Sequence, residues 1–266
     1  MLPTGFAGVE AQLWVWMIAM LRPGAAFLVA PVFGAQGVPL QLRLVISLAI
    51  GIAALGAGVE IVLPPNGVGS IAGVAMVAGE VLAGIALGLA VQIGFSAALV
   101  AGEVIGNTMG LGFATMMDPQ NGTSSQALGQ FLQILGTFLF LAIGGHLMLT
   151  AIIVNSYQAL PPGEAWLSAG AVRGLVMFGG DLFAAGLAIA LPVGFALVLV
   201  QLVMGMLARS APALNIFAVG LPATILAGVV LLAVSAPAIG EGIQAALLRG
   251  IETAQGLALD QGRSLD

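Results

Sequence analysis

The sequence predicts an all-α, polytopic integral membrane protein, and three observations support this fold class. Of its 266 residues, 60% are apolar and only 6% are charged, whereas a soluble domain carries about 25% charged residues. The mean hydropathy is +1.15. Apolar runs of about 20 residues, the length that crosses a bilayer, recur along the chain without the period-two alternation of strands. A surface with so little charge could not face water, so we expect the chain in a bilayer or in a very apolar assembly.

Three apolar regions fill the first half of the chain. The first, 12–33, is interrupted by Arg22-Pro23-Gly24, and the second, 42–63, ends at the turn signal Pro64-Pro65-Asn66-Gly67. The third, 71–105, contains no proline. At about 1.5 Å per residue it is too long for one straight span. We therefore expect either two spans with a bend or one long helix that leaves the bilayer.

Three more apolar regions follow. They cover 128–154, then 182–207 with Pro192 inside it, and 214–234 with Pro222 inside it. A polar tail, 241–266, closes the chain. The sequence therefore predicts six or seven apolar segments in a single helical membrane domain, 1–240, followed by that tail.

The residue inventory excludes several classes of function. All six basic residues are arginines, and the chain has no lysine, no cysteine and a single histidine, His146. This removes the P-loop lysine, the Schiff-base lysine, the thiolate nucleophile and any multi-histidine or cysteine metal site. A net charge of −5 with scattered arginines argues against nucleic-acid binding. Because no catalytic constellation emerges, we expect no enzyme activity, no cofactor and no metal.

Small residues recur at every fourth position from the third region onward. The members of this small-residue ridge are Gly94, Ala98, Gly102, Gly106, Gly110 and Ala114, and Gly84 and Gly88 form a further pair just before it. On a helix this spacing makes a ridge along one flank, and the missing side chains let another backbone approach closely. We expect a packing surface here, which the family resemblance given below would place in contact with a neighbouring subunit.

Ionisable residues in apolar surroundings form a second pattern: Arg22, Glu80, Glu103, His146 and Asp181. A lone charge in a bilayer is costly, so such groups pair or face protein and water. One interpretation is a proton relay. The other is salt bridges between helices or subunits, such as Arg22 with Glu80 or with Glu103. His146 fits a helix cap or a satisfied core histidine better than a ligand.

The most polar internal stretch is 107–130, which is rich in Gly, Ser, Thr, Asn and Gln and contains Met109, Met116 and Met117. Asp118 is its only charged residue. It is either an ordinary solvent loop or a segment that lies against protein or in a cavity. Polar irregular backbone at membrane depth is tolerated only in the second setting.

Five motifs, in order along the chain, give a resemblance to a known family. They are Arg22-Pro23-Gly24-Ala25-Ala26-Phe27 with Pro31, Pro39 and Arg43; Ala101-Gly102-Glu103-Val104-Ile105-Gly106-Asn107-Thr108-Met109-Gly110-Leu111-Gly112-Phe113-Ala114 with Asp118-Pro119; Gly145-His146-Leu147; Ser156-Tyr157-Gln158-Ala159-Leu160-Pro161; and Arg209-Ser210-Ala211-Pro212-Ala213-Leu214-Asn215-Ile216-Phe217 with Gly220-Leu221-Pro222. From about residue 12 to 240, the chain resembles the FliR family of flagellar biosynthetic proteins.

The resemblance implies a noncatalytic subunit of the flagellar type III export gate in the bacterial inner membrane, at the flagellar basal body. It implies long, kinked helical hairpins packed with FliP and FliQ into a helical multi-subunit stack that contacts FlhB. Unfolded flagellar proteins pass through the central conduit of that stack. Much of the chain would then face other subunits instead of lipid.

The resemblance also implies roles for particular residues. Residues 106–127 would form a plug in the conduit, with Met109, Phe113, Met116, Met117, Asp118 and Pro119 at the gate. The flexible thioether of methionine suits a deformable seal. Subunit contacts or buried charges would involve Arg22, Glu80, Glu103, His146, Arg209, Asn215 and Phe217.

The sequence departs from the family pattern at two positions, and other functions stay open. Thr108 and Ala213 stand where the family usually has glutamine, which puts any amide contact at those positions in doubt. Injectisome export proteins share the same signature. A stand-alone secondary transporter, with a site at the broken helices near Pro192 and Pro222, is a further alternative. The sequence lacks the group of catalytic residues that a membrane-embedded enzyme would need.

Overall fold

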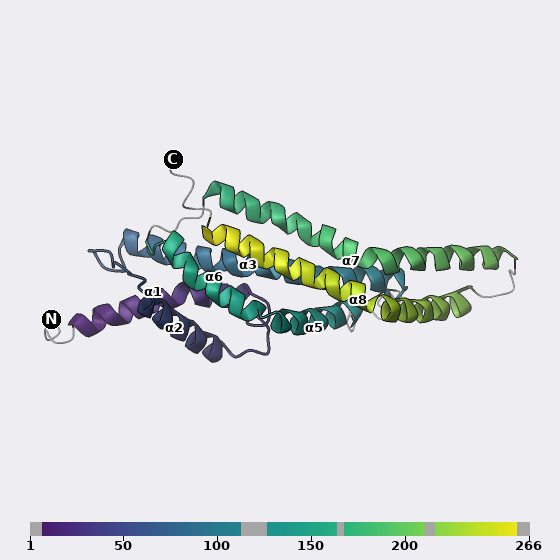
Figure 1. Cartoon of the computed structure of the whole chain (residues 1–266), viewed down its shortest axis with the longest axis horizontal. Helices are drawn as coiled ribbons and strands as arrows, with labels where there is room; N and C mark the ends of the chain where they lie inside the picture. Colours follow the sequence, from purple (N-terminus) through teal and green to yellow (C-terminus); the bar gives the residue numbers. More distant parts are fainter. Residues whose placement is uncertain (1–6, 113–126, 164–167, 211–215, 260–266) are drawn as a thin grey trace. The chain divides into compact units, whose positions relative to one another are not determined.

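A computed structural model describes residues 7–112, 127–163, 168–210 and 216–259. Within these ranges the chain forms seven α-helices and no strand (Figure 1). Four of the helices are long and apolar enough to cross a membrane, and a bent pair brings the number to five. These helices confirm the predicted all-α polytopic fold.

Helix α1 (Ala7–Val29) runs without a break through Arg22-Pro23-Gly24, where the sequence predicted an interruption. Proline removes one backbone donor from a helix interior, and the helix continues here because other groups satisfy the backbone, as described below. Helix α2 (Leu40–Gly56) is shorter than the predicted region and ends well before the proline turn. Glycines 58 and 67 follow it with positive φ angles, a backbone conformation that favours glycine.

Helix α3 (Ile71–Thr108) is a single helix of 38 residues. Of the two expectations for this region, the structure therefore has the one long helix. It ends at Thr108, and Gly110 shortly after it has a φ of +86°, the left-handed conformation common just after a helix.

The fourth apolar region is divided between two helices. Helix α5 (Ala127–Ala142) and helix α6 (Gly145–Ala159) are separated by a short break. Gly144 lies at the break with φ of +72°, which a residue with a side chain rarely adopts. A glycine at this position therefore lets the helix break within one apolar stretch.

The last two helices are the longest. Helix α7 (Ala169–Ser210) contains Pro192, and helix α8 (Ile216–Leu259) contains Pro222 and Pro237. Helix α8 continues beyond residue 240, and its side chains at Ile243, Leu247, Ile251 and Ala254 are buried. Most of the predicted polar tail is therefore a packed helix, because its apolar residues recur at helical spacing between the polar ones.

The chain divides into two compact units. The first comprises Met1–Gly94, Gly144–Phe178 and Leu248–Asp266, and the second comprises Phe95–Ile143 and Gly179–Leu247. The core of the first includes Ile18, Phe27, Leu87, Leu149 and Ile153, and that of the second includes Ile105, Leu132, Phe140, Leu197 and Ile243, all of them shielded from solvent.

Candidate functional site

The first unit encloses a buried ion pair between α1 and α3. The side chains of Arg22 and Glu80 are both completely inaccessible. The Arg22 Nε donates to Glu80 Oε2 at 3.0 Å, and Nη2 donates to Oε1 at 2.8 Å. This two-pronged geometry is the strongest form of an arginine–carboxylate contact. Of the two partners considered for Arg22, the structure brings Glu80 to it.

Helix α6 satisfies further donors of the same guanidinium. Arg22 Nη1 donates to the Ser156 hydroxyl at 2.9 Å, and Nη2 donates to the Leu160 carbonyl at 2.8 Å. The guanidinium carbon lies 4.1 Å from the centroid of the Tyr157 ring. A buried ion pair is tolerated only when its other donors and acceptors are also satisfied. We name Arg22, Glu80, Ser156, Tyr157 and Leu160 the arginine cluster.

Tyr157 also supports the proline in α1. Pro23 has no N–H, so the carbonyl of Ala19, four residues earlier, loses its helical partner. The Tyr157 hydroxyl donates to that carbonyl at 2.8 Å. A side chain from α6 therefore replaces the hydrogen bond that the proline removes, which explains how α1 continues through Pro23.

Glycines bring α3 close enough to α1 for this arrangement. A Cβ added at Gly84 would collide with the Arg22 carbonyl oxygen, and one at Gly88 would collide with the Ala26 carbonyl oxygen. The predicted GxxxG pair thus packs directly on the backbone of α1, beside the ion pair. Its physical effect is the close backbone approach that small residues allow.

The small-residue ridge packs on helices of the same chain. In the first unit, a Cβ on Gly250 of α8 would lie 3.3 Å from the Cα of Gly94. In the second unit, a Cβ on Gly102 would lie 2.5 Å from the Cα of Gly129 on α5, and one on Gly136 would lie 3.5 Å from the Cβ of Ala98. Gly94, Ala98 and Gly102 therefore contact helices of the same chain, and the contact of this ridge with a neighbouring subunit stays a prediction.

The described start of the predicted plug lies in the second unit. Met109 is 3% exposed and packs on Gly228 of α8, so its side chain lies in the core of this unit. Thr108, one of the two departures from the family pattern, donates its hydroxyl to the Val104 carbonyl of its own helix at 2.7 Å. The predicted gate residues Phe113, Met116, Met117, Asp118 and Pro119 lie outside the described residues, as does Asn215, and nothing is described of the Phe217 side chain.

The other predicted charged residues do not join the arginine cluster. Glu103 is half-buried near Gly129, and its Oε1 is buried without a hydrogen-bond partner in the described part of the chain. His146 lies in the first turn of α6, and its Nδ1 is likewise buried and unpartnered there, so it is not a helix cap. Arg209 and Asp181 are exposed on α7. Among the described residues no group of three acidic or histidine side chains could hold a metal.

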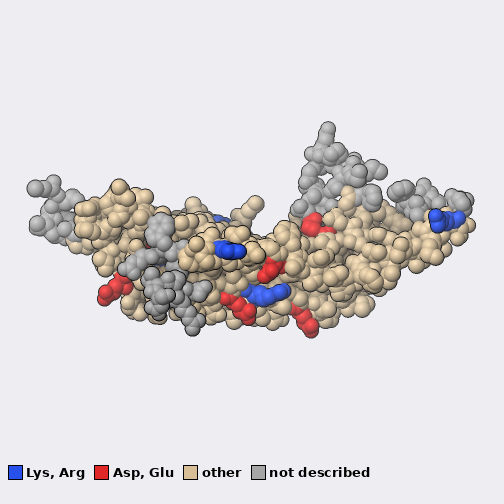
Figure 2. Space-filling view, turned by 90° about the horizontal axis from the view of Figure 1, so that it is seen from above, with Lys and Arg blue, Asp and Glu red and all other residues tan. Residues whose placement is uncertain are grey.

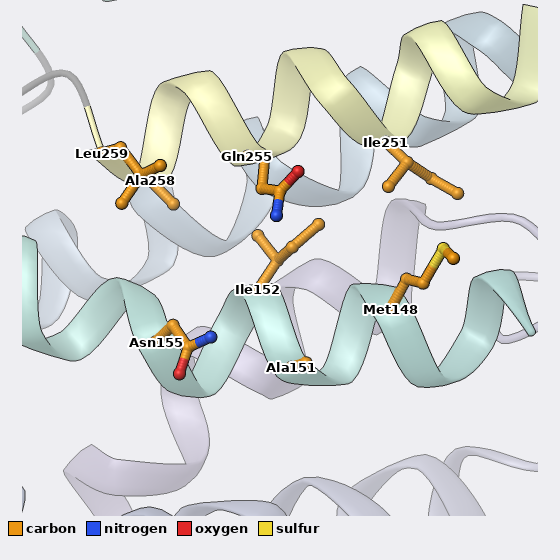
Figure 3. A pocket seen from close by; sticks show the side chains of 8 residues that line it. All are labelled: Met148, Ala151, Ile152, Asn155, Ile251, Gln255, Ala258 and Leu259. Carbon is orange, nitrogen blue, oxygen red and sulfur yellow. The ribbon is translucent and has the colours of Figure 1, made fainter.

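A groove of about 260 Å³ lies in the first unit between α6 and the end of α8 (Figure 3). Its walls are mostly apolar, and its polar groups are the amides of Asn155 and Gln255, of which Gln255 points toward α6. Neither a charge nor a hydroxyl lines it. The groove therefore offers shape and two amides, and it holds no group suited to acid–base or nucleophilic chemistry.

Sequence reasoning missed the roles of Ser156 and Tyr157 in the arginine cluster. The motif that contains them was recognised, but no function was attached to it. One signal was available, since a proline inside an apolar helix leaves a carbonyl four residues earlier that needs a donor. Which distant side chain supplies the donor depends on packing between α1 and α6, and no local pattern encodes that.

Comparisons with known proteins agree with the sequence motifs. Residues 13–250 match the family described as "Bacterial export proteins, family 1". The chain is 35% identical over 230 residues to the flagellar biosynthetic protein FliR of Escherichia coli, covering 86% of this chain and 85% of that protein. It is 41% identical over 170 residues to FliR of Pectobacterium carotovorum, covering 64% and 65%, and 31% identical over 225 residues to FliR of Caulobacter vibrioides, covering 84% and 89%.

Proposed function

The chain belongs to family 1 of the bacterial export proteins, as a relative of the FliR flagellar biosynthetic proteins, and from this membership we propose that it is a noncatalytic subunit of the flagellar protein-export gate. In this proposal it lies in the bacterial inner membrane at the flagellar basal body. It forms part of the conduit for unfolded flagellar proteins together with FliP and FliQ, and it contacts FlhB.

The length and exposure of the long helices carry this proposal. Helices α3, α7 and α8 have 38, 42 and 44 residues. At about 1.5 Å per residue each exceeds 55 Å, while the hydrocarbon core of a bilayer is about 30 Å thick. A span that crosses this core needs about 20 residues, so each of these helices is about twice as long as one span requires. Lipid tails therefore cannot cover the whole length of such helices.

The part of these helices that lipid tails cannot cover is apolar, and an apolar surface is better covered by a protein partner than by water. Only 22% of the most apolar window of α7 and 17% of that of α8 is buried within the chain. Large apolar side chains are exposed along α7, namely Phe183, Leu187, Leu191, Phe195, Leu199, Leu202, Val203, Met206 and Leu207. An apolar surface of this extent outside a bilayer marks an interface. The expected occupants are the other apolar subunits of the gate.

The scarcity of charged residues supports a role in the passage of unfolded proteins. Only 6% of the residues are charged, and on the face shown in Figure 2 the acidic and basic side chains lie among mostly uncharged residues. Such a surface would bind neither acidic nor basic segments of an unfolded cargo tightly, so cargo of varied sequence could move past it. We include in the proposal the plug formed by residues 106–127, of which residues 106–112 and 127 are described.

The proposal is tested in flagellated cells from which the chromosomal copy has been removed and a tagged copy supplied. We expect flagellar protein to disappear from the medium without the chain and to return with it. After mild detergent extraction, FliP and FliQ should copurify with the tagged chain in a fixed ratio. Export that persists without the chain would contradict the proposal, as would purification of the chain as a lone species. Loss of injectisome secretion alone would replace it with the injectisome alternative.

A further inference from the structure

The last backbone carbonyls at the carboxyl end of α3 all find hydrogen-bond donors, either locally or from other helices. The last carbonyls of a helix have no helical donor and must find other partners. Three of them are satisfied locally: Met109 N–H donates to Ile105 at 2.8 Å, Leu111 N–H to Gly106 at 3.0 Å, and Gly110 N–H to Asn107 at 3.0 Å. The positive φ of Gly110 makes this reversal of the chain possible.

The next two carbonyls are satisfied by side chains from other helices of the second unit. Gln201 of α7 donates its amide Nε2 to the Thr108 carbonyl at 2.7 Å. The Thr224 hydroxyl of α8 lies 3.2 Å from the Met109 carbonyl and 2.9 Å from the Leu221 carbonyl of its own helix, so its one proton is shared between them. The end of α3 is therefore complete only when α7 and α8 are docked on it.

Side-chain packing reinforces the same contact. A Cβ added at Gly228 of α8 would lie 2.6 Å from both Cγ and Cε of Met109 and 2.8 Å from its sulfur. Thr224 and Gly228 are four residues apart, so they face α3 from the same side of α8. One turn of α8 thus receives the Met109 side chain and shares a proton with its carbonyl.

We propose that Gln201 and Thr224 are positioning residues that fix the end of α3 and thereby hold the described start of the gate's plug, Thr108 and Met109, against α7 and α8. The proposal rests on the proposed function, because it assigns a regulator to that same gate. Detachment of α7 and α8 from Thr108 and Met109 is the movement that frees this end. Each missing hydrogen bond should raise the detached population about fivefold.

Near-isosteric substitutions remove the donors with little change of shape. We choose Gln201→Leu, Thr224→Val and the double variant, with Thr224→Ser as a conservative variant that keeps the hydroxyl. The matched controls are Gln244→Leu, an exposed glutamine on α8, and Thr253→Val, whose hydroxyl bonds only to its own helix at Arg249. All are made in the full chain and studied in the assembled complex.

Two readouts separate positioning from simple stability. Hydrogen exchange on the purified complex should show faster exchange of the Met109, Gly110 and Leu111 amides in the double variant than in either control. In cells that are not exporting, the passive proton leak across the inner membrane should rise several-fold in the double variant, while the subunits that copurify stay unchanged. Thr224→Ser should restore the leak to its original level.

Each result has a defined meaning. Unchanged amide exchange, or an unchanged leak in a fully assembled double variant, would overturn the proposal and leave the proposed function intact. A leak that rises equally in the two controls would also overturn it. The proposed function fails separately, if cells that lack the whole chain continue to export flagellar protein.

Discussion

Substitution of Tyr157 by phenylalanine tests how α1 tolerates its internal proline. The change removes only the hydroxyl that donates to the Ala19 carbonyl at 2.8 Å, and it keeps the ring that faces Arg22. Tyr157 is 3% exposed, so water cannot replace the lost donor. A buried carbonyl left without a partner costs about 1–3 kcal/mol of folding free energy. We expect Tyr157→Phe to destabilise the protein by this amount.

The effect should depend on Pro23. In Pro23→Ala the new backbone N–H can donate to the Ala19 carbonyl, as in an uninterrupted helix. Tyr157→Phe should then cost at least 1 kcal/mol less than it does in the original chain, because the carbonyl keeps a donor. The difference between the two costs is the coupling energy of a double-mutant cycle. It does not include the helix propensity of alanine, which cancels in the cycle.

The assay is unfolding of the four proteins in mixed detergent micelles, followed by the fluorescence of tryptophans such as Trp14 and Trp16. The free energy of unfolding is compared at one detergent composition. Distant, independent sites add within about 0.5 kcal/mol. If Tyr157→Phe costs the same in both backgrounds within that margin, the hydroxyl does not serve the proline, and the explanation for the continuity of α1 is wrong.

Further predictions concern charge and close packing. Glu80→Leu should lower the free energy of unfolding by about 3–5 kcal/mol, because it leaves Arg22 buried without its carboxylate partner. The double variant Arg22→Met, Glu80→Leu should recover most of that loss in the same unfolding assay. Gly102→Ala places a Cβ against the backbone of α5 and should lower the free energy of unfolding by about 1–3 kcal/mol. Gly256 has open space around it, so Gly256→Ala should not destabilise the protein. Glu103→Gln should leave the rate of flagellar protein export unchanged, because Oε1 of Glu103 has no partner among the described residues; a large loss of export would favour the proton relay.

The sequence predicted the fold class well, because hydrophobicity and helical spacing are local properties. The apolar runs mark the long helices, and the ridge of small residues marks the surface where helices approach closely. The break between α5 and α6 was not predicted, since it occurs at the left-handed Gly144 within a uniformly apolar run. The helical end of α8 was also missed, because its polar residues hid a buried apolar stripe.

The candidate site was predicted less completely than the fold. Arg22 and Glu80 stood out as charges in apolar surroundings, and a salt bridge between them was one of two options considered. Their α6 partners were missed, because a hydroxyl and a backbone carbonyl carry no charge that would single them out. Gln201 and Thr224 were missed for the same reason, as their role depends on contacts with a distant helix end.

The central claim is that protein subunits, and not lipid alone, cover the exposed apolar face of the long helices. Photo-crosslinking from single positions in living cells tests it most directly. A photoreactive residue would replace Phe183, Phe195 or Met206, which are 65%, 64% and 68% exposed on α7, with the buried Leu149 as control. We expect crosslinks from α7 to other subunits of the export gate and none from the control. Crosslinks to lipid alone at all three α7 positions would contradict it.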